Sequence, residues 1–517
     1  MVKLLTRCSF FATTADSHRV RELFKWASII TVALLPVHAA SLRANELSVE
    51  LPNIILAMAD DQGWGDVGYY GKSPAKTPSL DAMAASSLRL DRFYAACPVC
   101  SPTRGSVLTG RHPNRFGCFE WGHSLRPQEV TIAEALKQAG YVTGHFGKWH
   151  LGSVTATSDV SPGGSGFDTW FSSPNFFDLD PLMSRNGKVV RTKGEGSDVT
   201  VDAALSFIRD CANRKQKFLA VVWFGSPHNP HHAVEKDRSH YPGLSKEMQE
   251  YYGEITAIDR NIGRMRDALR ELNIAENTLF WYTSDNGPQG PSNRSRPGST
   301  GGFRDRKGTV YEGGLRVPTI IEWPMRIRQP RISAFPGNTV DIYPTLAELV
   351  GVDVPNQPKP LDGISLVPLL KANIELRQKP MGFWSGFSRG LSTRSRQLLE
   401  AMEKAEQTGD APAELNPPAT RKARIDGALK MFKTTGLVGN AAWTLDRYKL
   451  IKKHPRMSDK VTFELYDLID DPSESRNLAT AQPQRVKSMA QSLEQWQQSV
   501  IQSLQGRDYL TPATSNQ

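Results

Sequence analysis

The chain has 517 residues, of which 39% are hydrophobic, and it contains 41 Gly and 34 Pro. These values exclude a fibrous or disordered protein and predict two or three globular units rich in loops. The formal net charge is +10. The first 40 residues carry five Lys or Arg against two Asp or Glu, which leaves +7 on the remainder. A mild positive charge suits an anionic substrate, but without a basic stripe it does not indicate a nucleic-acid partner.

The first 40 residues are predicted to be a signal peptide. Basic residues precede the apolar run 26–35, and small residues follow at Ala39 and Ala40. This order is typical of a secretory signal, and the run is shorter than the roughly 20 apolar residues that span a membrane. We therefore expect a protein exported to the periplasm or the extracellular space, with no stable membrane anchor after cleavage.

Residues 51–375 are predicted to form one catalytic domain, because short apolar runs alternate there with helix-like segments. The runs 53–58, 218–224, 278–283 and 317–323 are apolar on both faces, as buried strands are. Strands that alternate with helices predict an α/β sandwich with a large mixed, mainly parallel sheet between helices.

Two helices carry clear end signals. Thr131 and Glu134 have the spacing of a capping box, and the helix that they open should end at Gly140. Residues 340–350 precede Gly351 and predict a second helix with a glycine at its end.

Residues 376–505 are predicted to form a smaller C-terminal α+β subdomain, followed by a tail at 506–517. A charged, partly helical insertion at 389–430 comes first. The segments 442–452 and 462–468 resemble two strands of a small antiparallel sheet, and a terminal helix is expected near 482–504.

Two acidic clusters follow predicted strands. Asp60 and Asp61 end the first strand, and Asp285 and Asn286 follow the strand at 278–283. Ligand sites of open α/β sheets lie at the carboxyl ends of strands. Carboxylate and amide oxygens suit Ca²⁺ or Mg²⁺, whereas zinc prefers nitrogen and sulfur. Each cluster by itself is also an ordinary turn or helix cap.

Four basic side chains accompany these clusters: Lys148, His150, His228 and Lys307. Cations and imidazoles at strand ends can bind an oxyanion and transfer protons. Taken singly, each is equally typical of an ordinary loop.

Four cysteines follow the signal peptide: Cys97, Cys100, Cys118 and Cys211. They are too few for a disulfide scaffold, and the sequence does not indicate whether any pair forms a bond. The spacing Cys97-x-x-Cys100 is compatible with a redox pair or half a zinc site. No second Cys pair or Cys/His cluster supports zinc, and the surrounding composition is not that of a thioredoxin.

The segment Cys100-Ser-Pro-Thr-Arg104, followed by Ser106-Val-Leu-Thr-Gly-Arg111, resembles the signature of type I sulfatases. In that family a maturation enzyme, the formylglycine-generating enzyme, recognises the signature and oxidises the cysteine to Cα-formylglycine. The resemblance spans about residues 51–480 in the expected order and includes the following segments: 53–65, 77–81, 147–152, 226–228, 284–287, Lys307, 312–318, 465–468, 471–474 and 477–478.

The loop after Gly117 and the helix at Thr131 are similar to the arylsulfatase A and N-acetylgalactosamine-6-sulfatase branch of that family. The resemblance implies the sandwich fold of the alkaline phosphatase superfamily.

The resemblance also implies a metal site. Its ligands would be Asp60, Asp61, Asp285 and Asn286, with the formylglycine at Cys100 as a further ligand. The implied ion is Ca²⁺, although oxygen ligands alone do not exclude Mg²⁺.

Catalytic roles follow from the same resemblance. Arg104 would hold the formylglycine hydroxyl, and Lys148 and Lys307 would bind sulfate oxygens. His150 would be the base that triggers sulfate elimination, and His228, with Lys307, would protonate the leaving alcohol. Hydrated formylglycine offers two hydroxyls on one carbon, of which one attacks sulfur and the other is later deprotonated to expel sulfate.

The expected substrate is a sulfated carbohydrate, such as a glycosaminoglycan or another sulfated polysaccharide. Specificity should depend on the loops near 167–191, 228–241 and 383–388, with His231 and His232 as candidates for the substrate pocket. Two other functions remain open: a phosphodiesterase or phosphonate monoester hydrolase of the same superfamily, and an inactive protein that binds sulfated glycans.

Overall fold

The structure is a computed structural model that describes residues 51–290, 296–456 and 460–509. The predicted signal peptide therefore lies outside the described residues. The chain divides into residues 1–51 and residues 52–517, and the architecture below is that of the second unit. Within the described part of the chain, no helix is both long enough and apolar enough to cross a membrane.

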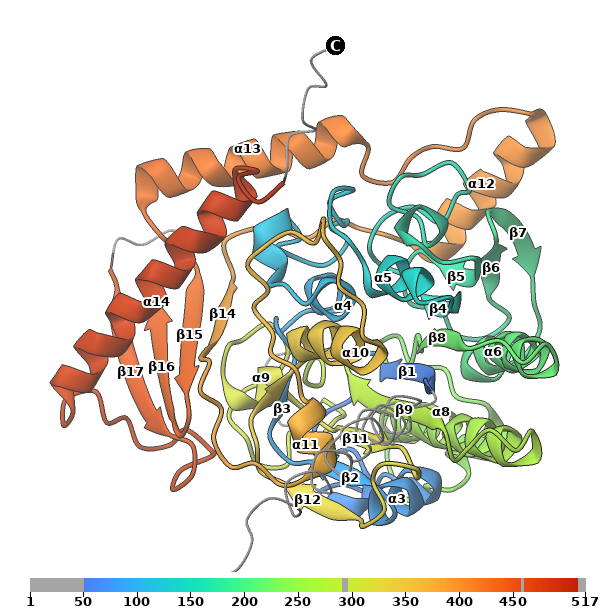
Figure 1. The fold of residues 1–517 in the computed structure, drawn as a ribbon, viewed down its shortest axis with the longest axis horizontal. Coiled ribbons are helices and arrows are strands. Elements are labelled where there is room, and N and C mark those ends of the chain that lie inside the picture. The colour runs from blue at the N-terminus through green and yellow to red at the C-terminus, as the bar shows by residue number, and fades with distance from the viewer. Residues whose placement is uncertain (1–50, 291–295, 457–459, 510–517) are drawn as a thin grey trace, which may run out of the picture. The chain divides into compact units, whose positions relative to one another are not determined.

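A ten-stranded sheet forms the centre of this unit (Figure 1). Its central strands are parallel to one another, and antiparallel strands extend it on both sides. The spatial order is β12 (Arg331–Ser333), β2 (Leu88–Leu90), β11 (Ile320–Glu322), β9 (Thr278–Ser284), β1 (Asn53–Ala59), β8 (Phe218–Trp223), β4 (Val142–Lys148), β5 (Thr169–Ser173), β6 (Leu182–Arg185) and β7 (Lys188–Arg191).

Helices cover both faces of this sheet. Every residue of β1 is buried, and its side chains at 55, 57 and 59 join one core cluster. That cluster includes the apolar faces of α6 (Gly196–Asn213) and α8 (Lys246–Glu271). Figure 1 shows α4 (Cys100–Thr109), α5 (Ile132–Gln138) and α10 (Ile342–Val350) on the other side of the sheet. The predicted α/β sandwich is confirmed.

The helix-end signals are also confirmed. The Thr131 hydroxyl accepts a hydrogen bond from the Glu134 amide at 3.2 Å, and the Thr131 amide donates to the Glu134 carboxylate at 2.7 Å. This reciprocal capping box satisfies two amides that the first turn of α5 would otherwise leave without partners. Gly351 ends α10 at a φ of 68°, a conformation that favours glycine.

The prediction of one strand at 317–323 is wrong. Residues Arg316–Val317 form β10, which pairs with β3 (Phe93–Tyr94) in a three-stranded sheet completed by β13 (Gly337–Asn338). Residues Ile320–Glu322 form β11 in the large sheet instead. Pro318 lies between the two strands, and proline lacks the amide that a continuous ladder needs.

The C-terminal part contains a separate antiparallel sheet of β14 (Met381–Ser385), β15 (Asn440–Leu445), β16 (Tyr448–Lys453) and β17 (Thr462–Asp467). The predicted strand at 442–452 is therefore a hairpin of two strands, which turns at Asp446 with a φ of 53°. The helix α14 (Pro483–Leu504) packs against this sheet (Figure 1).

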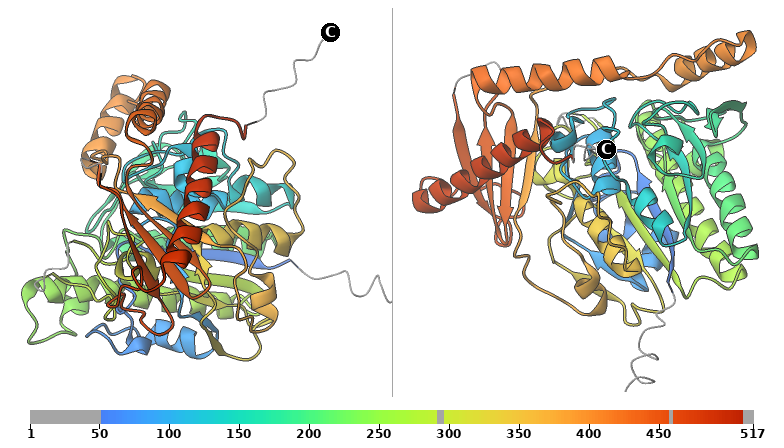
Figure 2. Two further views of the ribbon diagram at one scale, coloured as in Figure 1. Left: turned by 90° about the vertical axis from the view of Figure 1, so that its left-hand side faces the viewer. Right: turned by 45° about the horizontal axis from the view of Figure 1, so that its top comes forward.

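The predicted helical insertion contains α12 (Ser395–Thr408) and the start of α13 (Pro418–Thr435). The α13 side chains of Ala428 and Phe432 join the same apolar core as α14. Figure 2 shows the backbone of α13 in orange and that of α14 in red. The division of the chain at residue 375 stays a prediction.

Candidate active site

Four adjacent parallel strands, in the order β9, β1, β8 and β4, bring the sequence-predicted residues to one edge of the large sheet. Each strand contributes at or just beyond its carboxyl end: Asp285 and Asn286 after β9, Asp60 and Asp61 after β1, His228 after β8, and Lys148 and His150 at the end of β4. The shared direction of these strands is the reason that residues more than 200 positions apart meet there.

Cys100 is the first residue of α4, and all ten residues of that helix are buried. Its thiol lies 3.3 Å from the Lys307 ammonium and 3.9 Å from Asp61 Oδ1. Gly105 brings the helix close to the aromatic ring of Phe116, where an added Cβ would lie 2.9 Å from the ring. The helix is thus held rigidly in the interior with Cys100 at the predicted site.

The acidic side chains are interlinked. The Asp61 amide donates to Asp285 Oδ1 at 3.1 Å, and Asn286 Nδ2 donates to Asp61 Oδ1 at 2.7 Å. Asp60, Asp61 and Asp285 are all completely buried. Three buried carboxylates at one place need compensating positive charge, because burial destabilises an isolated ion.

Three cations supply that charge. Lys148 Nζ lies 2.5 Å from Asp60 Oδ2, and Lys307 Nζ lies 2.6 and 2.7 Å from the two oxygens of Asp61. Arg104 Nη2 lies 2.7 Å from Asp285 Oδ2 and 3.6 Å from Asp60 Oδ1. Each carboxylate therefore has a cationic partner in the interior.

These charges shift the pKa values in opposite directions. Burial acts to raise the pKa of Asp60, but Lys148, His228 and Arg104 outweigh it and hold that pKa below its usual value. For Asp285, burial and the neighbouring charge of Asp60 prevail and raise the pKa. Burial also raises the pKa of the Cys100 thiol. A buried thiol with a raised pKa is a poor nucleophile.

Two histidines complete the site. His228 lies with Nδ1 2.7 Å from the Asn229 carbonyl and Nε2 3.8 Å from Asp61 Oδ2. Burial lowers its pKa to about 4, although Asp61 and Asp60 act in the opposite direction. His150 adopts a φ of 55°, and its Nε2 lies 3.1 Å from the Thr393 hydroxyl. Burial, with Lys148 and Arg104 nearby, lowers the pKa of His150.

Several oxygens at this site are suited to a cation. One ligand atom from each of Asp60, Asp61, Cys100 and His228 lies within 4.8 Å of the others. Two further observations fit a hard cation: Asp60 Oδ1 and Asn286 Oδ1 are buried and have no hydrogen-bond partner among the described residues. Buried oxygens without a donor are costly unless something else satisfies them, so the residues present fit a bound Ca²⁺ or Mg²⁺.

Three further residues that bear on this site have no signal in the sequence. Thr393 bonds His150, and Asn175 Nδ2 in turn donates to the Thr393 hydroxyl at 2.9 Å. Burial raises the pKa of Glu120 to about 7, although the positive charge of Lys307 acts in the opposite direction. These contacts join loops distant in sequence, so no motif or spacing could have predicted them.

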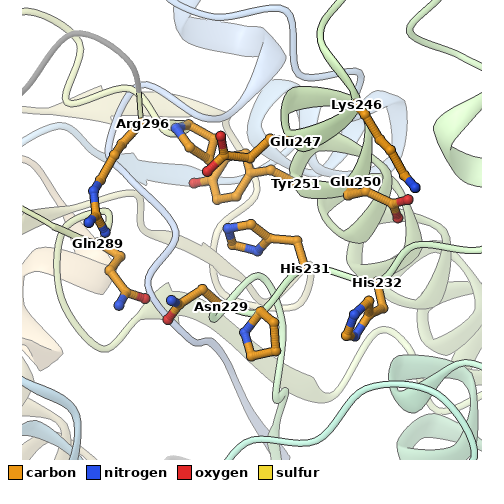
Figure 3. Close-up of a pocket in the computed structure, with 11 residues that line it drawn as sticks. Asn229, His231, His232, Lys246, Glu247, Glu250, Tyr251, Gln289 and Arg296 are labelled. Carbon is orange, nitrogen blue, oxygen red and sulfur yellow. The ribbon is translucent and has the colours of Figure 1, made fainter.

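His231 and His232 line a separate cleft of about 490 Å³ (Figure 3). His231 Nδ1 lies 3.4 Å from Glu254 Oε2, and His232 Nδ1 lies 2.5 Å from Asp178 Oδ2. The cleft is also lined by Lys246, Glu247, Glu250, Tyr251, Gln289 and Arg296. Because residues 229–232 directly follow His228, this cleft begins beside the candidate catalytic centre.

The four cysteines Cys97, Cys100, Cys118 and Cys211 are all free and buried. Cys97 lies at 0% exposure beside Cys100, so it is a small core residue and not a partner for Cys100.

Comparison with known proteins settles the family. The family model described as Sulfatase matches residues 52–352, which contain every site residue named above except Thr393. The chain belongs to the sulfatase family. Sulfatases are sulfuric ester hydrolases, and the alkaline-phosphatase-like sandwich predicted from the sequence agrees with this membership.

Individual relatives support the same branch. The chain is 33% identical to N-acetylgalactosamine-6-sulfatase of Canis lupus familiaris over 392 residues, which cover 68% of this chain and 72% of the relative. It is 32% identical to human arylsulfatase A over 376 residues, or 65% of this chain and 71% of the relative. The crystal structure of Ps i-CgsB in complex with k-i-k-neocarrahexaose has the same fold, with a TM-score of 0.71, 24% identity and coverage of 87% and 93%.

Proposed function

We propose that this sulfatase hydrolyses sulfate esters of sulfated carbohydrates through a formylglycine made from Cys100 and with a bound Ca²⁺. The observation that carries the proposal is the buried cluster around Cys100. There, three carboxylates, an amide, three cations and two histidines converge at the carboxyl ends of four parallel strands. This combination holds a cation, binds an anion and moves protons at one place.

The thiol of Cys100 is poorly suited to act as the nucleophile itself, because burial raises its pKa. Oxidation to formylglycine would replace it with a hydrated aldehyde whose hydroxyl can attack sulfur. All ten residues of α4 are buried, which limits when a formylglycine-generating enzyme can reach Cys100. A formylglycine-generating enzyme could read this segment only before the chain folds, so we propose that maturation precedes folding.

Asp60, Asp61, Asp285 and Asn286 would hold the Ca²⁺ through their oxygens, together with the oxidised Cys100 side chain. The cation would make the attacking hydroxyl more acidic and neutralise charge on the sulfate. Lys148 and Lys307 neutralise Asp60 and Asp61 in this structure. If a dication took over that role, their ammonium groups would be able to bind sulfate oxygens.

The two histidines would handle protons. The Nδ1 of His228 hydrogen-bonds the Asn229 carbonyl, so Nε2 carries a proton only when the ring is an imidazolium, and that form would protonate the leaving alcohol. The Thr393 hydroxyl fixes the ring of His150 through Nε2, while Nδ1 is buried without a hydrogen bond. This orientation suits His150 to the role of the base that releases sulfate.

The proposed substrate class and the proposed localisation are supported by different observations. The relatives include an N-acetylgalactosamine-6-sulfatase, and a structural neighbour holds a neocarrahexaose. The formal charge of +7 beyond residue 40 favours an acidic polymer. The charge, apolar run and small residues of the first 40 positions support export to the periplasm or extracellular space.

Mass spectrometry of the peptide that contains Cys100 tests the proposed oxidation of that residue. Protein co-expressed with a formylglycine-generating enzyme should carry the aldehyde, and sulfate release should rise in proportion to the aldehyde content. Equal sulfate release from protein that carries only the thiol would refute the proposed nucleophile.

A further inference from the structure

A second cleft, of about 700 Å³, lies between α13 and the segment after β14. Three arginines line it: Arg389 on the segment, Arg424 on α13 and Arg456 beyond β16. Phe387 and Met431 contribute apolar surface between them. Neither Asp nor Glu is among the described residues that line this cleft, so its charge is wholly positive. We call it the arginine groove.

The three arginines have no acidic partner in the part of the chain that the structure describes. None of them forms an ion pair with a carboxylate in the described ranges, whereas Arg421 and Lys422 on the same helix pair with Asp159 and Asp426. Within the described residues, the Arg424 guanidinium donates to two neutral oxygens, the Gly117 carbonyl at 3.0 Å and Asn416 Oδ1 at 3.2 Å. Burial lowers the pKa of Arg424 to about 10, and neighbouring Arg421 acts in the same direction. Uncompensated guanidinium groups in a cleft favour an anionic ligand.

One short segment of the chain, residues 389–393, links the lining of the arginine groove to the candidate active site. The Arg389 carbonyl lies 3.0 Å from His123 Nε2 at the groove, and Thr393 bonds the candidate base His150. Four residues of extended chain span at most about 14 Å. Arg389 in the groove therefore lies within about 14 Å of Thr393, the residue that contacts His150.

An exposed aromatic side chain lies on the same path. Trp121 is 40% exposed and packs against Gly390, where an added Cβ would lie 2.1 Å from the indole. The Leu391 amide donates to the Trp121 carbonyl at 2.9 Å, and the neighbouring Gly122 amide donates to Ser101 Oγ, one residue from Cys100. Trp121 thus offers an apolar face between Cys100 and the arginine groove, as sugar rings require.

We propose that the arginine groove binds sulfate or carboxylate groups on sugar residues that flank the hydrolysed one, with the chain crossing Trp121. The inference rests on the proposed function, and it adds that the substrate is a polyanionic chain several sugars long. A planar guanidinium bonds sulfate and carboxylate oxygens in pairs, which gives the groove both affinity and register along such a chain.

The test measures binding apart from turnover. The probe is size-fractionated dextran sulfate, with neutral dextran of equal length as the control, titrated calorimetrically into the full-length Cys100→Ala protein. The Arg389→Gln/Arg456→Gln double variant removes two exposed side chains and should weaken binding of dextran sulfate by about tenfold. Lys422→Gln/Lys433→Gln removes the same number of positive charges from α13 outside the groove and should leave binding unchanged.

Each outcome decides between the two proposals. In the formylglycine-bearing protein, the double variant should retain wild-type hydrolysis of a small aryl sulfate. Unchanged dextran sulfate binding by the double variant, or binding of single-stranded DNA as tight as that of dextran sulfate, would overturn the groove as a glycan site. Hydrolysis of aryl sulfate without any dextran sulfate binding would overturn the groove and leave the proposed function intact. Groove-dependent binding with no hydrolysis of any sulfate ester would support the groove and overturn the proposed function.

Discussion

Replacing Lys449 with Met should destabilise the fold by several kcal/mol, because Lys449 neutralises two buried carboxylates. Its ammonium lies 2.9 Å from Glu312 Oε1 and 2.9 Å from Glu474 Oε1, and all three side chains are at most 1% exposed. Lys449 belongs to β16 in the C-terminal sheet, whereas Glu312 begins α9 (Glu312–Leu315), close in sequence to Lys307. The contact therefore ties the C-terminal sheet to the part of the chain that carries a candidate catalytic cation.

The size of the stability loss depends on which partners Glu312 and Glu474 keep after Lys449→Met. Tyr94 donates to Glu312 at 2.9 Å and Arg316 lies 3.5 Å away, but Glu474 loses its only ion-pair partner among the described residues. Breaking a buried pair by removing one partner costs about 3–5 kcal/mol. Adding Glu474→Gln to Lys449→Met removes the stranded charge and should recover about half of that loss.

Equilibrium unfolding in urea at neutral pH gives the free energy of unfolding. Lys452→Met is the matched control, because Lys452 lies on the same strand and bonds only the neutral oxygens of Leu437 and Gln497. The Lys449→Met deficit should also shrink as pH falls, because the stranded carboxylates then take up protons. A loss no larger than that of Lys452→Met would refute the assigned role of Lys449.

Three further predictions concern the site and the pH response. Thr393→Val removes a bond to His150 and should lower kcat for an aryl sulfate about fivefold, or about 1 kcal/mol, and shift its pH profile, with KM little changed; a change in KM alone would contradict a positioning role. Chelation of divalent cations should abolish sulfate release and lower the Tm, with recovery by Ca²⁺, whereas Asp60→Asn protein should show no Ca²⁺-dependent Tm shift; full activity after chelation would exclude the metal. Burial lowers the pKa of His112 to about 3, below its unfolded value near 6.5, so this group stabilises the fold above pH 6.5 and the effect is lost as pH falls. Between a pH above 6.5 and pH 5, the free energy of unfolding should fall by about 2 kcal/mol because of His112, and this part of the fall should disappear in His112→Gln. Urea unfolding at both pH values measures it, and an equal fall in the variant would contradict the assignment to His112.

The sequence predicted the centre of the sheet because its strands are apolar along their whole length. The segments at 53–58, 218–224 and 278–283 are buried on both faces, and such runs have few alternatives to a central strand. The positions of Asp60 and Asp285 after two such strands marked both as candidates for a ligand site, since ligand sites lie at the carboxyl ends of strands, and the family resemblance joined them in one metal site. The capping box at Thr131 was readable for a local reason, because both bonds span three residues.

Other features depend on contacts that no local pattern encodes. The run 317–323 is as apolar as a single strand, yet Pro318 divides it between two sheets. The hairpin at 440–453 was predicted as one strand, because its turn has only two residues, Asp446 and Arg447, and lacks a glycine. Thr393 reaches His150 across 243 positions, from a segment whose composition predicted only a charged insertion.

The comparison of sulfate and phosphate esters tests the central claim most directly. Protein matured by a formylglycine-generating enzyme would be assayed with an aryl sulfate, the matching aryl phosphate and an aryl phosphodiester, beside Cys100→Ala. The account predicts that kcat/KM is highest for the sulfate ester and that all turnover vanishes in the variant. Preference for either phosphorus ester, or sulfate release that survives Cys100→Ala, would contradict it.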